Sequence, residues 1–146
     1  MRLSTKGRYA VMAMTDLARR EGEKAVALAE IAARQDISLA YLEQLFARLR
    51  RSGLVASVRG PGGGYRLARS ATETSIADIV LAVDEPLRAT RCAGLAGKGC
   101  MPGGERCLTH DLWEAMGRQI EGWLASVSLE DVAEGRLKPS PAEAAA

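Results

Sequence analysis

SLAYLEQLFARLRRSGLVASVRGPGGGYRLAR, residues 38–69, is the stretch of this chain that decides its fold. Leucine or phenylalanine occupies positions 42, 45, 46 and 49, which is the spacing of one buried helix face. Ser38 is a suitable N-cap and Gly53 a suitable C-terminal stop, so the pattern predicts a helix that runs to about residue 52. LVASVR and YRLAR alternate as strands do on either side of GPGGG, and they predict a β-hairpin with a glycine-rich tip.

Two helices are predicted before this stretch, over residues 8–20 and 28–34, and a polar turn, QDIS, separates the second from the third. Helix, short helix, turn, helix and hairpin in this order make the winged helix-turn-helix arrangement. We therefore predict a fold that is mainly α with a small β-wing. Residues 1–85 are expected to form the DNA-binding domain.

A further helix is predicted over residues 75–83, with Ser75 and Asp78 as its capping box. Residues 86–108 are rich in glycine, contain all three cysteines and show neither helical nor strand periodicity. A bare loop of this length in a compact domain needs something that orders it. We interpret it as a metal- or cluster-binding loop.

The segment 109–134 is predicted to hold a long dimerisation helix, residues 109–127, and a short helix capped by Ser128 and Asp131. The apolar residues of the long helix step by three and four, which is typical of a coiled-coil seam. Packing against its own domain is the alternative. Residues 135–146 are predicted to be a disordered tail. The seam residues are Trp113, Met116, Ile120, Trp123, Leu124 and Val127.

The charge is distributed unevenly along the chain. Lys and Arg outnumber Asp and Glu by 13 to 6 in residues 1–70, a net charge of +7, and are outnumbered 7 to 12 in residues 71–146, a net charge of −5; together these give the +2 of the whole chain. A basic first half favours a polyanion partner such as double-stranded DNA, although chance clustering would look the same.

Composition excludes several classes of protein. An odd number of cysteines argues against a disulfide framework, and no apolar run approaches the length of a membrane span. The basic start of the chain lacks the apolar stretch of a secretory signal, so we expect a cytoplasmic protein without a membrane partner.

The helix that starts at Ser38 is expected to enter the major groove. Ala40, Gln44, Ala47 and Arg51 point away from its buried stripe, with Glu43 and Arg48 on the flanks. Gln44 can pair with adenine through two hydrogen bonds, whereas Glu43 can only accept, for example from cytosine N4. For any one of these residues, a merely solvated helix face is the alternative.

Arg59 precedes the glycine-rich tip of the hairpin, where backbone amides can approach a phosphate and an arginine can enter a narrow minor groove. The tip lacks the lysine and hydroxyl residue of a P-loop, so nucleotide binding is not expected. The residues predicted to contact DNA are Ser38, Ala40, Tyr41, Glu43, Gln44, Arg48 and Arg51 on the helix, and Arg59, Gly60, Pro61 and Gly62 on the wing.

The three cysteines and the one histidine of the chain, Cys92, Cys100, Cys107 and His110, all fall within residues 92–110. This grouping predicts a metal centre rather than unrelated thiols. Three thiolates and an imidazole suit tetrahedral zinc, but gaps of seven and six residues between the cysteines are wider than usual for structural zinc and suit a larger iron–sulfur cofactor.

MRLSTKGRYAVMAM, ISLAYLEQLFARLRRSGLVASVRGPGGGYRLAR, ATRC and CLTHDLW resemble the IscR family of iron–sulfur-sensing winged-helix transcription regulators, over about residues 1–132. The resemblance implies a homodimer, operator binding by the third helix and wing, and control of iron–sulfur assembly genes, with repression as the expected mode. It also implies a 2Fe-2S cluster on the four ligands, with the iron–sulfur assembly machinery as its donor.

Other functions remain alternatives at this point. Related regulators respond to nitric oxide or iron, and a zinc-stapled DNA-binding protein would need no sensing. A thiol enzyme is not expected, because the sequence has no Cys-x-x-Cys pair and its one histidine is assigned as a ligand.

Overall fold

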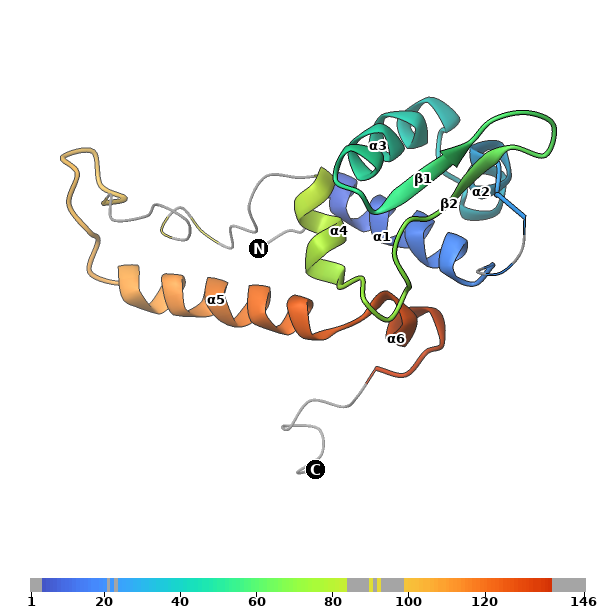
Figure 1. The fold of residues 1–146 in the computed structure, drawn as a ribbon. Coiled ribbons are helices and arrows are strands. Elements are labelled where there is room, and N and C mark those ends of the chain that lie inside the picture. Colours follow the sequence, from blue (N-terminus) through green and yellow to red (C-terminus); the bar gives the residue numbers. More distant parts are fainter. Residues whose placement is uncertain are drawn as a thin grey trace.

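A computed structural model describes residues 4–20, 22, 24–83, 90, 92 and 99–137. It confirms a mainly helical fold with one small antiparallel sheet (Figure 1). The elements are α1 (Thr5–Ala18), α2 (Leu28–Gln35), α3 (Leu39–Arg51), β1 (Val55–Val58), β2 (Gly64–Leu67), α4 (Ile76–Val83), α5 (His110–Ser126) and α6 (Leu129–Ala133).

The predicted third helix is α3. The Ser38 hydroxyl accepts a hydrogen bond from the Tyr41 backbone N–H, as expected of an N-cap, and Gly53 after the helix has a φ of +74°. Leu42, Leu45, Phe46 and Leu49 are at most 2% exposed, so the stripe inferred from the sequence is the buried face.

Helix α1 begins at Thr5, three residues before the predicted start, because the Ser4 hydroxyl accepts a hydrogen bond from the Gly7 N–H and caps it there. It ends at Ala18 rather than at residue 20. The prediction rested on apolar spacing and overlooked the cap.

Strands β1 and β2 pair with Val55 opposite Leu67 and Val58 opposite Gly64. Val26, just before α2, exchanges two backbone hydrogen bonds with Tyr65, of 2.9 and 2.8 Å, and so ties the wing to the helices. Gly64 has a φ of +158°, and a Cβ at this position would lie 2.2 Å from the Val26 carbonyl oxygen. Only glycine therefore permits this close approach.

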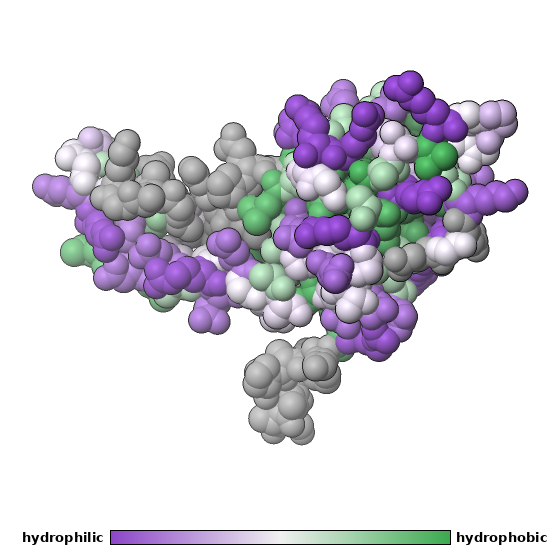
Figure 2. All heavy atoms as spheres, in the orientation of Figure 1, coloured by the Kyte–Doolittle hydropathy of each residue, from purple (hydrophilic) through white to green (hydrophobic). Residues whose placement is uncertain are grey.

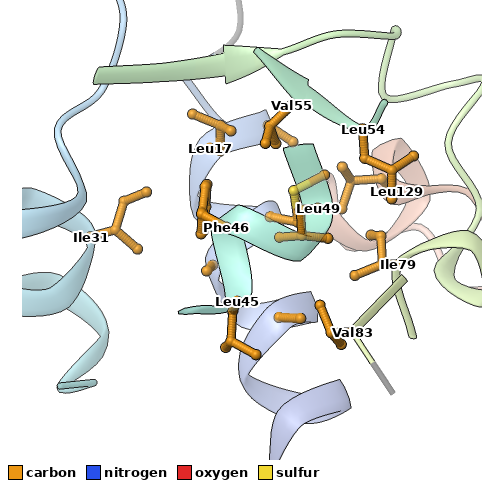
Figure 3. Close-up of a cluster of buried hydrophobic side chains, with 14 of the residues drawn as sticks. Leu17, Ile31, Leu45, Phe46, Leu49, Leu54, Val55, Ile79, Val83 and Leu129 are labelled. Carbon is orange, nitrogen blue, oxygen red and sulfur yellow. The ribbon is translucent and has the colours of Figure 1, made fainter. Parts of the chain in front are cut away.

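One hydrophobic core joins α1, α2, α3, α4, α6 and the start of the wing (Figure 3). Phe46 lies at its centre and meets the Tyr65 ring edge-on at 5.0 Å. Leu129 of α6 is fully buried, so the short C-terminal helix belongs to the same body as the DNA-binding helices.

Helix α4 has the predicted capping box, since Ser75 and Asp78 exchange hydrogen bonds of 3.0 and 3.1 Å between side chain and backbone. The Ile76 N–H also donates to the Val127 carbonyl oxygen at 2.9 Å. The start of α4 is thereby fastened to the end of α5, while the rest of α5 extends away from the core (Figure 1).

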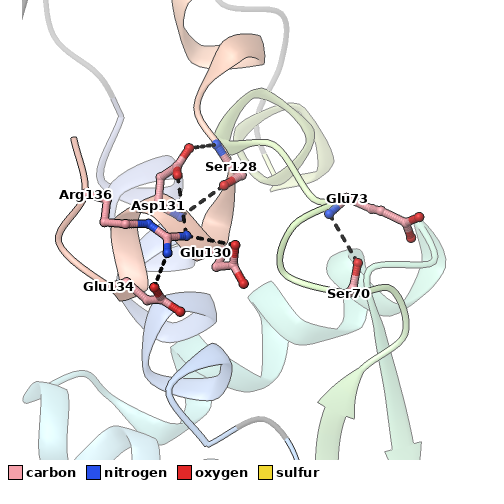
Figure 4. A network of polar contacts seen from close by, with 7 residues as sticks. All are labelled: Ser70, Glu73, Ser128, Glu130, Asp131, Glu134 and Arg136. Atoms are coloured by element: carbon pink, nitrogen blue, oxygen red, sulfur yellow. Dashed lines mark hydrogen bonds and ion pairs between the residues drawn. The ribbon is translucent and has the colours of Figure 1, made fainter. Parts of the chain in front are cut away.

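Helix α6 has the predicted capping box of Ser128 and Asp131 (Figure 4). The start of the disordered tail was predicted too early in the chain, at residue 135. Arg136 folds back onto α6 and forms ion pairs with Glu130, Asp131 and Glu134. The ordered chain includes residues 135–137. Residues 138–146, the remainder of the predicted tail, lie outside the described residues.

Candidate metal centre and nucleic-acid interface

The fold brings the four predicted metal ligands together. The sulfur atoms of Cys92, Cys100 and Cys107 and a ring nitrogen of His110 all lie within 4.8 Å of one another. Cys92 Sγ is 3.5 Å from Cys107 Sγ, and Cys100 Sγ is 3.5 Å from His110 Nδ1. No other group of three or more potential ligands is found in the described part of the chain.

A tight turn and a helix start position three of the four ligands. Met101 and Glu105 are joined by a 3.0 Å backbone hydrogen bond, which returns the chain so that Cys107 lies beside Cys100. Gly99 lies close against this turn, because a Cβ at its position would be 2.1 Å from the Glu105 carbonyl oxygen. His110 is the first residue of α5, and its N–H donates to the Cys107 carbonyl oxygen at 3.1 Å.

Two groups near Cys100 and Cys107 would stabilise a thiolate bound to a metal. The Cys107 N–H donates to Cys100 Sγ at 3.3 Å, and the positive end of the α5 dipole faces the cysteines. Hydrogen bonds and dipoles of this kind stabilise negative charge on sulfur and tune a metal centre.

Cys92 and His110 are 6% and 3% exposed, respectively, so half of the ligand set is buried. Burial, together with the adjacent Cys100 and Cys107 thiols, raises the pKa of Cys92 to about 12. The hydrogen bond with Cys100 lowers the pKa of Cys107. A buried thiol with a high pKa is neutral without a metal, and metal binding requires it to release its proton.

Thr109 lies beside the metal site and was not among the residues predicted from the sequence. Its hydroxyl accepts a hydrogen bond from Trp113 Nε1 at 3.0 Å and lies 3.8 Å from Cys107 Sγ. It therefore links the long helix to a ligand. The spacing of four residues between Thr109 and Trp113 on a helix was the available signal.

The predicted DNA-reading surface is exposed. Ala40, Glu43, Gln44 and Arg51 are all on the solvent side of α3, and Figure 2 shows hydrophilic side chains along the edge formed by α3 and the wing. Tyr41 is half-buried, because its ring meets that of Tyr9 edge-on at 5.9 Å.

Arg48 is exposed but is directed toward α4. Its Nη1 donates a 2.8 Å hydrogen bond to the Val83 carbonyl oxygen. Leu39, at the start of α3, is 42% exposed and was not among the predicted contacts. Leu39 adjoins the buried stripe on the helix, so the apolar spacing alone did not indicate that it is exposed.

The wing tip has the geometry expected of a close contact. Arg59, Gly60, Pro61 and Gly62 are exposed, and Gly60 and Gly62 have φ values of +100° and +73°. The Gly63 N–H closes the tip by donating to the Gly60 carbonyl oxygen at 2.9 Å.

The apolar face of α5 divides into two parts. Trp113, Met116 and Ile120 are half-buried, and Leu112 and Trp123 are 59% and 56% exposed.

The C-terminal end of this face belongs to the core of its own domain. Val127 is 8% exposed within the core and Leu124 packs against it, so the inclusion of Val127 in the seam is wrong. The apolar spacing of α5 continues in the sequence past the point where the helix meets α4.

None of the helices in the described residues has both the length and the apolar character needed to span a membrane.

Comparison with known proteins agrees with these features. Residues 3–135 match the family model of Rrf2, described as an iron-dependent transcriptional regulator. The chain is 57% identical over 132 residues to the HTH-type transcriptional regulator IscR of Photorhabdus laumondii, and 54% identical over 132 residues to that of Serratia proteamaculans. Each alignment covers 90% of this chain and 79% of the relative.

Two solved structures have a similar fold. The CymR global cysteine regulator of B. subtilis has a TM-score of 0.79 at 32% identity, over 94% of this chain and 99% of that one. T. potens IscR has a TM-score of 0.74 at 38% identity, over 96% of this chain and 94% of that one.

Proposed function

Because this chain belongs to the Rrf2 family of iron-dependent transcriptional regulators, we propose that it binds operator DNA under the control of an iron–sulfur cluster. The convergence of Cys92, Cys100, Cys107 and His110 is the observation that carries this proposal. These four residues would hold a 2Fe-2S cluster, which supplies a redox-active and removable group beside the DNA-binding domain.

The donor set supports a labile cluster. Imidazole replaces one negatively charged thiolate with a neutral ligand that can be protonated, which raises the reduction potential and eases loss of the cluster. Such a cluster suits a gauge of cluster supply better than an electron carrier. We propose that the regulated genes encode the iron–sulfur assembly machinery, that the machinery donates the cluster, and that control is by repression.

The recognition surface would consist of the exposed face of α3 and the tip of the wing. Gln44 and Glu43 have the donors and acceptors to address base edges, whereas Arg59 has the charge and position for a phosphate or the minor groove. The net charge of +7 over residues 1–70 supports attraction to DNA.

The homodimer is also proposed. Leu112 and Trp123 are eleven residues apart on α5, which is three helical turns to within about 20°, and both are exposed. Exposed aromatic and aliphatic side chains in one line are typical of a subunit interface. Two-fold symmetry would set two recognition helices about one DNA turn apart.

A zinc-stapled DNA-binding protein is the second candidate. Four ligands on one tetrahedral zinc ion lie about 3.8 Å apart. The observed separations, from 3.5 Å up to 4.8 Å, suit one ion once the widest of them contract. A two-iron cluster requires the ligand atoms to spread farther. The wide spacing of the cysteines in the sequence and the IscR relatives favour the cluster.

Anaerobic purification followed by a visible spectrum and metal analysis distinguishes the two candidates. A brown protein with iron and acid-labile sulfide in equal amounts supports the cluster. A colourless protein with one zinc per chain contradicts it. DNA titration of the cluster-loaded and cluster-free forms at the same salt concentration then tests control, since equal affinities would exclude regulation by the cluster.

A further inference from the structure

Arg48 connects the DNA-reading helix to the end of α4 that leads to the metal centre. Its Nη1 lies 2.8 Å from the carbonyl oxygen of Val83, the last residue of α4. The next described ligand, Cys92, follows nine residues later in the chain. Arg48 of the recognition helix therefore contacts the end of α4, and the first metal ligand, Cys92, follows α4 in the sequence.

The contact between Arg48 and Val83 has the chemistry of a helix cap. The last four carbonyl groups of a helix lack partners within the helix, and a cation is favourable at that end of the helix dipole. The Val83 side chain is fully buried in the core, so the carbonyl that Arg48 meets is on a firmly packed residue.

The opposite end of α4 is fastened differently. Ile76 donates to the Val127 carbonyl oxygen, and Ser75 pairs with Ser128, so the start of α4 is joined to the end of α5. His110 lies at the other end of α5. Helices α4 and α5 are thus joined at one end by backbone hydrogen bonds, and the ligand atoms of Cys92 and His110 lie within 4.8 Å of each other.

We propose that Arg48 is a positioning residue that couples occupancy of the metal site to the DNA affinity of α3. This inference rests on the proposed function. With the site filled, Cys92 is held beside Cys107 and His110, and the end of α4 stays capped by Arg48. Loss of the metal releases Cys92 and loosens the last turn of α4. The hydrogen bond from Arg48 to the Val83 carbonyl oxygen is then weakened.

The position of Arg48 on α3 supports a role separate from direct base reading. On a helical wheel Arg48 lies beside Tyr41, on the flank of α3 rather than at the centre of the exposed face with Ala40 and Gln44. A change at this flank would alter how α3 sits on the domain. This meets the physical requirement for allostery, namely two sites that both bias one element.

The test compares Arg48→Gln, Arg48→Lys and Arg51→Gln with the parent protein, each with and without its cluster. The probe is a labelled duplex selected from a random-sequence library by the cluster-loaded parent, titrated at one salt concentration. Arg51 lies on the same helix and hydrogen-bonds only to its own turn, at the Ala47 carbonyl oxygen, among the interactions described. It is therefore the matched loss of one positive charge.

Arg48→Gln should reduce the ratio of loaded to cluster-free affinity by about fivefold or more, which is the lower range of allosteric coupling. Arg48→Lys should restore most of the ratio, because an ammonium can also donate a hydrogen bond to a carbonyl at the end of a helix. Arg51→Gln should weaken both forms by the same factor. Hydrogen exchange should also rise in the last turn of α4 in Arg48→Gln.

An unchanged affinity ratio in Arg48→Gln would overturn the coupling and leave Arg48 as an ordinary phosphate contact. An unchanged exchange rate in α4 would overturn the capping role. Equal affinity of the loaded and cluster-free parent protein is a separate result, because it contradicts the proposed function itself and removes the coupling with it.

Discussion

Asp16 of α1 and Arg34 of α2 form a two-point ion pair, in which Arg34 Nη2 donates to Oδ1 at 2.7 Å and Nε donates to Oδ2 at 3.0 Å. Gln35 adds a third hydrogen bond to the same carboxylate, at 2.8 Å. Asp16 is only 7% exposed. These contacts fix the second helix against the first, and through it the polar turn from which α3 starts.

Replacing Arg34 with Met should lower the free energy of unfolding by about 2 kcal/mol, because a buried carboxylate loses its two strongest hydrogen bonds. Chemical denaturation measures this loss. Arg50→Met is the matched control, since Arg50 is exposed on α3, and it should change stability by about 0.5 kcal/mol or less. Equal losses in the two variants would contradict a structural role for the ion pair.

The same carboxylate predicts a pH dependence of stability. Burial alone would raise the pKa of Asp16, but hydrogen bonds from Arg34 and Gln35 and the charges of Arg34 and Arg20 together hold it below 3.8. The unfolded chain therefore takes up this proton first as the pH falls. The stability that the Asp16 carboxylate contributes is complete above pH 3.8, the ordinary pKa of this group. It is lost as the pH falls through the lower pKa of Asp16 in the folded state.

Asp16→Asn should accordingly be less stable than the parent protein at neutral pH, and the difference should shrink in acid. Unfolding curves collected from neutral pH down to about pH 2 test this. A constant difference over that range would show that Asp16 does not titrate with folding.

The parts of the fold that depend on local pattern could be predicted from the sequence. The stripe of Leu42, Leu45, Phe46 and Leu49 and the turn GPGGG specify α3 and the wing through helical spacing and glycine chemistry. The metal ligands could be predicted because cysteine and histidine are scarce and fall close together in the chain.

Contacts between distant segments could not be predicted. Arg34 lies 18 residues from Asp16, and Arg48 lies 35 residues from Val83, and no periodicity links either pair. Val127 continued the apolar spacing of α5, but only the packing of that helix end against α4 determines that it faces the core.

Glutamate substitutions in the two parts of the apolar face of α5 should have different effects on the protein. Leu112→Glu combined with Trp123→Glu should give folded monomers, because both side chains are exposed in the protomer and a buried charge is costly only in the dimer. Val127→Glu should instead unfold the domain. Sedimentation and thermal denaturation measure the two effects, and a dimer that survives the double substitution would remove α5 as the interface.

DNA recognition should separate into strength and selectivity. Arg59→Ala should weaken binding to all duplexes and reduce its salt dependence, as loss of a phosphate or minor-groove contact does. Gln44→Ala should lose about 1–3 kcal/mol of discrimination at particular base pairs. Titrations against a set of single-base variants of a selected duplex test both, and unchanged binding in both variants would show that the recognition surface lies elsewhere.

The ligand substitutions provide the last prediction. Cys92, Cys100 and Cys107, each replaced by Ala, should abolish the visible absorption of the anaerobic protein but preserve its far-ultraviolet circular dichroism, because the core around Phe46 contains none of the ligands.

His110→Cys should retain a cluster, bind it more firmly and lower its reduction potential, since a thiolate brings a negative charge that imidazole lacks. Anaerobic spectroelectrochemistry and the rate of cluster loss to a chelator measure these changes. The contrast between the two kinds of variant identifies the role of each ligand, because a residue that only supports the fold would not change the potential. An unchanged spectrum and potential in His110→Cys would exclude His110 from the ligand set. The three cysteines would then need another partner at the start of α5, where Thr109 lies 3.8 Å from Cys107 Sγ.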